Sequence, residues 1–164
     1  MKYALILTFF LLIPPYAYAL DLVPLEACTL MDDVLDSKGH PWRVDSNSGG
    51  CGTTYQNLPS QGVIKSNVAY YANGDSSSAK QLKIILNIND TSTADHNIQT
   101  FKHYCGKLYM KLIKKPWSME FSKEFDKTTR DGIQRSWKVN EIDFILLKKI
   151  WPTGKGYELQ FIVE

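Results

Sequence analysis

The sequence predicts an α+β fold in which two helices pack on antiparallel sheet. Three observations favour this class. A long segment in the middle of the chain has apolar residues at helical spacing, and a shorter segment near the start has the same spacing. Several other segments are rich in β-branched and aromatic residues and are separated by turn-forming stretches, as in antiparallel hairpins. Together these patterns indicate helices on one side of a sheet.

Residues 1–19 differ in composition from the rest of the chain and predict a secretory signal peptide. Lys2 gives a basic start, an uncharged apolar run follows, and residues 17–19 have the small-x-small pattern of a cleavage site. The run is short for about 30 Å of hydrocarbon, so a membrane anchor is the weaker alternative. We therefore expect residues 20–164 to form a single α+β domain that is soluble and periplasmic or secreted, with no stable membrane insertion.

The charge of the chain is unevenly distributed. The formal net charge is +2, and loss of Lys2 with the signal peptide would lower it to +1. Residues 20–100 contain 5 basic and 9 acidic residues, whereas residues 101–164 contain 13 basic and 8 acidic residues. This basic field is too weak to favour nucleic-acid binding. The asymmetry instead predicts that the basic half meets either the acidic half or an acidic partner.

Three cysteines follow the predicted cleavage site, and export predicts that two of them form a disulfide. A helix and a returning extended segment separate Cys28 from Cys51, and this path allows the two side chains to meet. Cys105 lies on the apolar side of the second helix, where a buried free thiol is expected. The sequence favours a Cys28–Cys51 disulfide and leaves Cys51–Cys105 as the alternative.

The first half predicts a helix followed by extended segments. Apolar residues recur at helical spacing over residues 21–37, and Pro24 suits the first helical turn. A short extended segment covers residues 42–45, and a loop rich in Ser, Asn and Gly covers residues 46–60. Two strands complete this half; their ranges are 63–72 and 81–88, with a hairpin loop at 73–78.

The second half predicts a longer helix and three strands. Ser92 and Asp95 resemble a capping box, and Pro116 ends the helix. Its apolar side is the strongest periodic pattern in the chain; the residues are Ile98, Phe101, Cys105, Leu108, Tyr109, Leu112 and Ile113. An extended piece and a charged loop are expected over residues 117–131. The predicted strands cover 133–139, 142–150 and 157–163, with a turn at 152–156 before the last one.

The two halves also suggest an internal duplication of an α-β-β-β unit, with half-repeats over residues 20–90 and 91–164. In each half a cysteine precedes a helical run, a Pro-Trp pair follows, and strands complete the unit. The pairs are Pro41 and Trp42 in one half and Pro116 and Trp117 in the other. Coincidence is the alternative, because proline is common after helices.

The sequence contains no motif for cofactor binding or catalysis, and we expect no cofactor. It has no phosphate-binding glycine loop, no metal-binding cysteine or histidine spacing and no nucleophile elbow. His96 and His103 lie on one side of the second helix, about 10 Å apart along its axis. That separation is too large for two ligands of one zinc ion, so two surface histidines are expected.

Two groups of residues keep an enzyme open as an alternative. Cys51 lies in a glycine-rich loop and would need a nearby base to act as a nucleophile, although a disulfide is the stronger expectation. Glu120, Glu124 and Asp126 form an acidic cluster of the kind that cleaves glycosidic bonds. Neighbouring lysines favour a solvated loop instead.

These observations favour an exported protein that binds a protein partner, most concretely a periplasmic inhibitor or immunity protein that neutralises a toxin or hydrolase. Such proteins need a rigid scaffold and a few projecting side chains. The alternatives are a small exported hydrolase that uses Cys51 or acidic residues, and a subunit of an envelope or secretion assembly. The candidate contact residues lie on a hairpin tip, a strand turn and a basic helix side; they are Ser76, Ser77, Ser78, Trp151, Lys155, Lys107 and Lys111.

Overall fold

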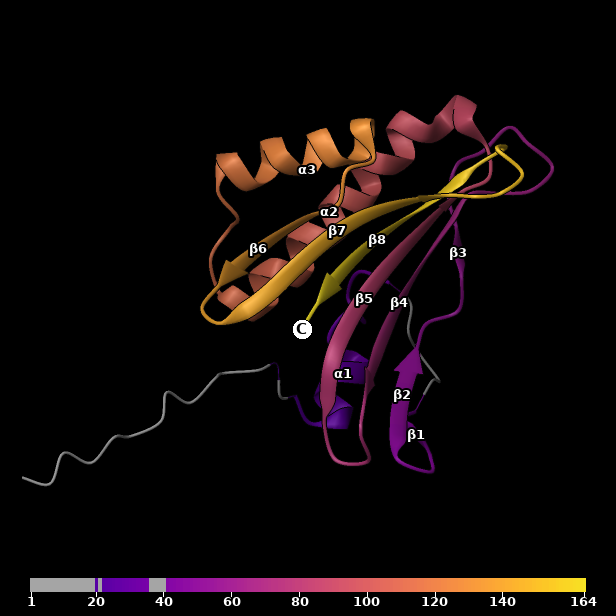
Figure 1. Ribbon diagram of the computed structural model, residues 1–164. Coiled ribbons are helices and arrows are strands. Elements are labelled where there is room, and N and C mark those ends of the chain that lie inside the picture. Colours follow the sequence, from indigo (N-terminus) through magenta and orange to yellow (C-terminus); the bar gives the residue numbers. More distant parts are fainter. Residues whose placement is uncertain (1–19, 21, 36–40) are drawn as a thin grey trace, which may run out of the picture.

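The computed structural model describes residues 20, 22–35 and 41–164 (Figure 1). It has an α+β fold with an eight-stranded antiparallel sheet, which confirms the predicted class. The predicted signal peptide lies outside the described residues, so its cleavage stays a prediction. Leu20, the first residue after the expected cleavage site, is buried in the hydrophobic core. No helix in the described ranges is long and apolar enough to cross a membrane.

The sheet consists of two antiparallel meanders whose last strands pair in the middle. The strands are β1 (Arg43–Asp45), β2 (Ser48–Gly52), β3 (Gln56–Asn57), β4 (Asn67–Gly74), β5 (Ala79–Ile88), β6 (Arg135–Val139), β7 (Ile142–Ile150) and β8 (Tyr157–Val163). Their order across the sheet is β1-β2-β4-β5-β8-β7-β6, and β3 pairs with β4. β5 and β8, the last strands of the two halves, are therefore neighbours at the centre.

The helices pack against this sheet through a single hydrophobic cluster. They are α1 (Pro24–Thr29), the 3-10 turn η1 (Thr91–Thr93), α2 (Ala94–Ile113) and α3 (Met119–Asp131). α1 contacts β2, β4 and β5, whereas α2 contacts β5 and α3 contacts β6 and β7. Figure 1 shows the consequence: the short α1 covers one half of the sheet, and the longer α2 and α3 cover the other half.

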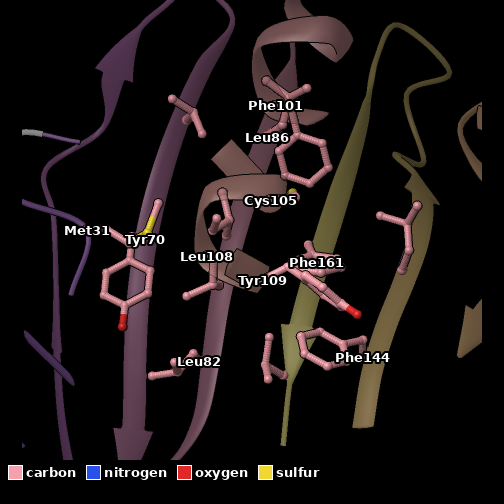
Figure 2. Close-up of a cluster of buried hydrophobic side chains, with 14 of the residues drawn as sticks. Met31, Tyr70, Leu82, Leu86, Phe101, Cys105, Leu108, Tyr109, Phe144 and Phe161 are labelled. Atoms are coloured by element: carbon pink, nitrogen blue, oxygen red, sulfur yellow. The ribbon is translucent and has the colours of Figure 1, made fainter. Parts of the chain in front are cut away.

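The centre of the core lies between α2 and the two middle strands. Phe101, Cys105 and Leu108 of α2 point toward Leu86 of β5 and Phe161 of β8 (Figure 2). All five side chains are fully buried. The predicted apolar side of the second helix is therefore confirmed at these positions, although Leu112 is only half-buried. The alternating pattern predicted for the last strand is confirmed as well.

Two predicted elements of the first half differ from the structure. The first helix is only six residues long, and the described residues that follow it form turns. The loop predicted over residues 46–60 contains β2 and β3. A side chain at Gly49 would lie 2.3 Å from the Trp42 indole nitrogen, and one at Gly52 would lie 2.6 Å from the Tyr71 ring. These glycines allow close packing within a sheet, and the sequence pattern alone resembled a flexible loop.

The 3-10 turn η1, which leads into α2, is capped by a residue that the sequence analysis missed. The capping box expected at Ser92 and Asp95 is wrong, because Asp90 accepts the hydrogen bond from the Ser92 backbone N–H at 3.0 Å. The other Asp90 oxygen accepts from the backbone N–H groups of Gln61 and Gly62 at 2.7 and 3.0 Å. Asp90 thus fixes the loop that precedes β4. This strand begins at Asn67, four residues later than predicted.

The main correction in the second half is α3, which replaces the predicted extended piece and charged loop. Ser118 caps this helix, since its hydroxyl accepts from the backbone N–H of Phe121 at 3.1 Å. Gly132, with φ of 75°, ends it in the left-handed conformation. Only two aromatic residues, Phe121 and Phe125, mark its buried side, and charged residues surround them.

The two halves therefore share a terminal meander of three strands but differ in their helices. β2, β4 and β5 form one meander, and β6, β7 and β8 form the other. The Pro41–Trp42 pair precedes a strand, whereas the Pro116–Trp117 pair precedes α3. The expected short strand after Trp117 is thus wrong, and an internal duplication stays a hypothesis.

Candidate functional site

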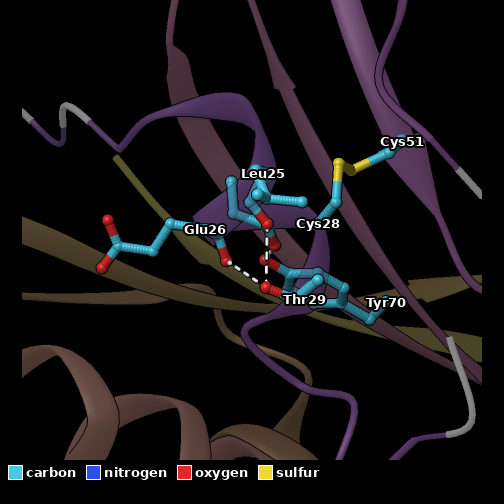
Figure 3. Close-up of a disulfide and its surroundings, with 7 residues drawn as sticks. Leu25, Glu26, Cys28, Thr29, Cys51 and Tyr70 are labelled. Atoms are coloured by element: carbon cyan, nitrogen blue, oxygen red, sulfur yellow. Dashed lines mark hydrogen bonds between the residues drawn. A yellow bond between two sulfur atoms is a disulfide. The ribbon is translucent and has the colours of Figure 1, made fainter.

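The cysteine predictions are confirmed. Cys28 of α1 and Cys51 of β2 form a disulfide, with Cα atoms 5.9 Å apart (Figure 3). Cys105 is a buried free thiol, and burial raises its pKa well above the ordinary value. A bridged Cys51 has no thiol, so its interpretation as a nucleophile is wrong. Burial and a raised pKa also make Cys105 a poor nucleophile.

The acidic cluster does not form a pair of carboxylates. Glu124 binds Arg135 Nε at 2.9 Å and also contacts Lys127, and the hydrogen bond from Lys127 is the largest cause of its lowered pKa. Asp126 binds Lys102 Nζ at 2.6 Å. A general acid at neutral pH needs the opposite change, a raised pKa. These carboxylates are therefore suited to ion pairing within the fold.

The candidate loop residues lie far from one another. The hairpin tip with Ser76, Ser77 and Ser78 and the turn with Trp151 and Lys155 lie at opposite ends of the sheet (Figure 1). β5 alone separates the two ends by ten residues, about 33 Å of strand. One compact binding surface on this protein therefore cannot be centred on both loops.

Both turns have contacts within the turn. At the hairpin tip, Asp75 accepts from the backbone N–H groups of Ser77 and Ser78 at 2.7 and 2.9 Å. Hydrogen bonds, first of all from the Ser77 hydroxyl, lower the Asp75 pKa to about 2. Trp151 is half-buried, and a side chain at Gly156 would lie 2.6 Å from its ring. Trp151 thus packs within its own turn, which reduces its availability to a partner.

The two lysines predicted on the second helix have different roles. Lys111 Nζ binds Asp33 Oδ1 at 2.7 Å and links α2 to the segment after α1. The hydrogen bond from Lys111 lowers the Asp33 pKa. Lys107 has no ion-pair partner in the described part of the chain and lines a hollow beside α2. Of these two residues, Lys107 is the better candidate for contact with another molecule.

Two adjoining hollows follow the side of α2 toward α3. The wider one, about 740 Å³, lies between α2, α3, β7 and β8; its lining includes His96, Gln99, Asp126, Arg130, Lys148 and Tyr157. The narrower one, about 450 Å³, lies between α2 and the segment before α3; its lining includes Gln99, Lys102, Lys107, Met110 and Trp117. Because Gln99 lines both, we treat them together as the α2–α3 groove.

The wider end of the groove has cations without carboxylate partners. Lys148 Nζ donates to the Thr129 carbonyl oxygen at 2.8 Å and lies 4.2 Å from the centroid of the Tyr157 ring. This arrangement holds the ammonium group in place by a cation–π contact. Neither Lys148 nor Arg130 has an ion-pair partner within the described residues. Asp95 is the one carboxylate lining this end that has no such partner either.

The narrower end of the groove is apolar at its base. Trp117 stacks on Phe121, with ring centroids 5.0 Å apart, and also contacts Phe125. The indole lies against α2 at Gly106, where a Cβ atom would be in ordinary van der Waals contact with the ring at 3.4 Å. Met110 stands beside it and is 43% exposed. The groove thus has a rigid aromatic surface next to a flexible apolar side chain.

Sequence reasoning found only part of this site. Lys107 was identified, and His96 and His103 were placed on one side of the helix, which is the side that lines the groove. Trp117, which the sequence analysis identified only as part of a Pro-Trp pair, is half-buried and lines the narrower end of the groove. Arg130 and Lys148 were missed because their position depends on α3.

Comparisons with protein-family models, curated proteins and solved structures found no match to this chain. Within the described residues, no group of three or more His, Cys, Asp or Glu side chains is arranged to hold a metal ion. The α2–α3 groove is the candidate functional site in the described part of the chain.

Proposed function

We propose that this chain is an exported protein-binding protein, most concretely an inhibitor or immunity protein that neutralises a toxin or hydrolase. The observation that carries the proposal is the α2–α3 groove, which combines a concave surface, an exposed apolar end and cations that pair with no carboxylate among the described residues. Aromatic and arginine side chains in such settings dominate the affinity of protein interfaces. The disulfide supports export, because disulfides persist in oxidising compartments.

The walls of the groove support the same proposal because both helices are firmly fixed. α2 packs its buried side on β5, and Lys102 of α2 binds Asp126 of α3. Arg135 of β6 fastens the end of α3 through bonds to Asp131 and Glu124 at 2.8 and 2.9 Å. A rigid surface loses little conformational freedom when a partner binds, and this favours affinity.

Site-specific photocrosslinking tests this function. A photoreactive amino acid replaces Met110 in the groove or, as the matched control, the exposed Ser136 on β6. The chain is expressed with its first residues intact in its own host, and crosslinked proteins are identified by mass spectrometry. We expect one defined protein adduct at position 110 and none at position 136. If that protein is a toxin, deletion of the gene should make the host sensitive to it.

Other outcomes would separate the alternatives. Adducts with several components of one membrane assembly would support the envelope or secretion subunit instead. No adduct at position 110, or the same adducts at both positions, would contradict the proposed binding surface.

A further inference from the structure

We infer that the α2–α3 groove binds an extended acidic segment of the partner protein. In this complex an apolar side chain of the segment packs against Trp117 and Met110, and its carboxylates bind Lys107, Arg130 and Lys148. This inference rests on the proposed function and specifies the chemistry of the partner.

The length of the groove fits an extended peptide. On α2 its lining runs from Asp95 to Met110, a separation of fifteen residues. At 1.5 Å per residue this distance is about 22 Å. An extended chain advances about 3.3 Å per residue, so about seven residues span the groove. A segment of six to eight residues therefore reaches both ends at once.

The charge of the groove favours carboxylates. Asp126 compensates Lys102 at 2.6 Å, so this pair contributes no net charge. Three cations then remain without an ion-pair partner in the described ranges, Lys107, Arg130 and Lys148, against one such carboxylate, Asp95. Lys148 gives one hydrogen bond to a carbonyl oxygen, which leaves donors for a ligand. The surplus positive charge complements an acidic segment.

The apolar end supplies the anchor that distinguishes a peptide from a simple polyanion. The Trp117 ring is held by Phe121 and Phe125 and can receive a side chain without rearrangement. Met110 can adapt to the shape of that side chain. A nucleic acid is disfavoured because its charge is regularly spaced, and Asp95 and Asp126 line the wider end of the groove. A peptide can place its carboxylates away from these two residues.

Fluorescence polarisation with a defined probe tests the inference. The probe is a fluorescein-labelled eight-residue peptide with acidic residues at both ends and one central leucine. The matched peptides replace the acidic residues by lysine or the leucine by serine. The protein is used without residues 1–19, and circular dichroism verifies that every variant is folded. Anionic phospholipid vesicles are tested by sedimentation in parallel.

The protein variants separate the groove from general charge. Lys107→Glu combined with Arg130→Glu reverses two groove cations, and Lys123→Glu reverses an exposed lysine of α3 that does not line the groove. We expect the double variant to bind the acidic peptide at least tenfold more weakly and Lys123→Glu to remain within about twofold of the unchanged protein. The lysine peptide should not bind, and the serine peptide should bind several-fold more weakly.

Several results would overturn the inference. These are no binding of the acidic peptide, equal binding by both variants, or groove-dependent binding to the vesicles without binding to the peptide. If crosslinking at position 110 still identifies a partner, the proposed function survives and only the acidic-segment chemistry fails. If the peptide binds as expected but no partner is found in cells, the chemistry holds and the proposed function fails.

Discussion

The two halves of the sheet are stabilised by different means. In the first half the short α1 is fixed to the strands by the Cys28–Cys51 disulfide and by the Tyr70 hydroxyl, which donates to the Ala27 carbonyl oxygen at 2.7 Å. In the second half, two long helices are held by packed aromatic rings. Phe121 is central there, with ring centroids 4.3 Å from Trp137 and 5.0 Å from Trp117.

This difference accounts for the groove in the second half. A single short helix leaves little apolar surface to bury, and a covalent link compensates for the missing contacts. Two adjacent helices bury more surface and also leave a hollow between them. The half that is stabilised by packing therefore also carries the candidate binding site.

The largest effect is expected for a substitution that disrupts the aromatic packing of the second half. Phe121→Ala removes a side chain that is 4% exposed and contacts several rings, so we expect a loss of about 3–5 kcal/mol in the free energy of unfolding. Met119→Ala on the same helix removes a side chain that is 82% exposed and should change it by less than about 0.5 kcal/mol. Urea unfolding measures both. Equal effects would contradict the assignment of the buried side of α3.

Removal of the disulfide should weaken the other half. The bridge joins residues 23 apart in the sequence, and the Cys28→Ala, Cys51→Ala double variant should lose about 3 kcal/mol by the chain-entropy model. Hydrogen exchange localises the change. Protection should fall first in α1, β1 and β2 and persist in α2 and α3. Loss of protection that is uniform over the sheet would show that the two halves do not differ in this way.

A smaller, pH-dependent effect concerns the link between α3 and β6. Hydrogen bonding, first of all from Arg135, lowers the Asp131 pKa from 3.8 to about 2. Because this pKa is depressed in the folded state, the ion pair stabilises the fold above about pH 4 and stops doing so as the pH falls toward 2.

The variant Arg135→Gln sharpens this prediction. It should be slightly less stable than the unchanged protein at about pH 6, and this difference should shrink as the pH falls through about 2, as measured by urea midpoints. A stability difference that does not change with pH would show that Arg135 acts by packing alone.

The smallest effect is expected for the ion pair that joins the two halves across α2. Lys111 and Asp33 form this pair at the surface, where solvent weakens the attraction. Lys111→Ala should therefore change the free energy of unfolding by less than about 0.5 kcal/mol. A loss above 1.5 kcal/mol, roughly, in the same urea experiment would mean that this contact holds the halves together.

The sequence predicted the parts of the molecule in which the spacing of apolar residues or of cysteines corresponds directly to their positions in the fold. The apolar side of α2, the alternating residues of β8 and the pairing of Cys28 with Cys51 belong to this group. α3 escaped prediction because two buried phenylalanines stand among charged residues that form ion pairs only in the folded chain. β2 was not predicted because its glycines permit close packing against Trp42 and Tyr71, and the sequence pattern does not show these contacts.

The groove was beyond prediction for the same reason. Its residues come from α2, the segment before α3, α3, β7 and β8, and their proximity depends on a helix that the sequence pattern did not indicate. Lys107 was selected only because it continued a basic side of α2. Arg130, in the predicted charged loop, and Lys148, within a predicted strand, gave no sign that they would lie beside one hollow.

The most direct test of the account is an NMR titration of the isotopically labelled protein with the acidic leucine-containing peptide. We predict that backbone amide shifts change along α2 and α3 and at the β7 end near Lys148, while the hairpin tip with Ser77 and the exposed Ser136 on β6 remain unaffected. Changes concentrated at the hairpin tip or spread over the strands, or no changes at all, would contradict the α2–α3 groove as the binding site of this protein.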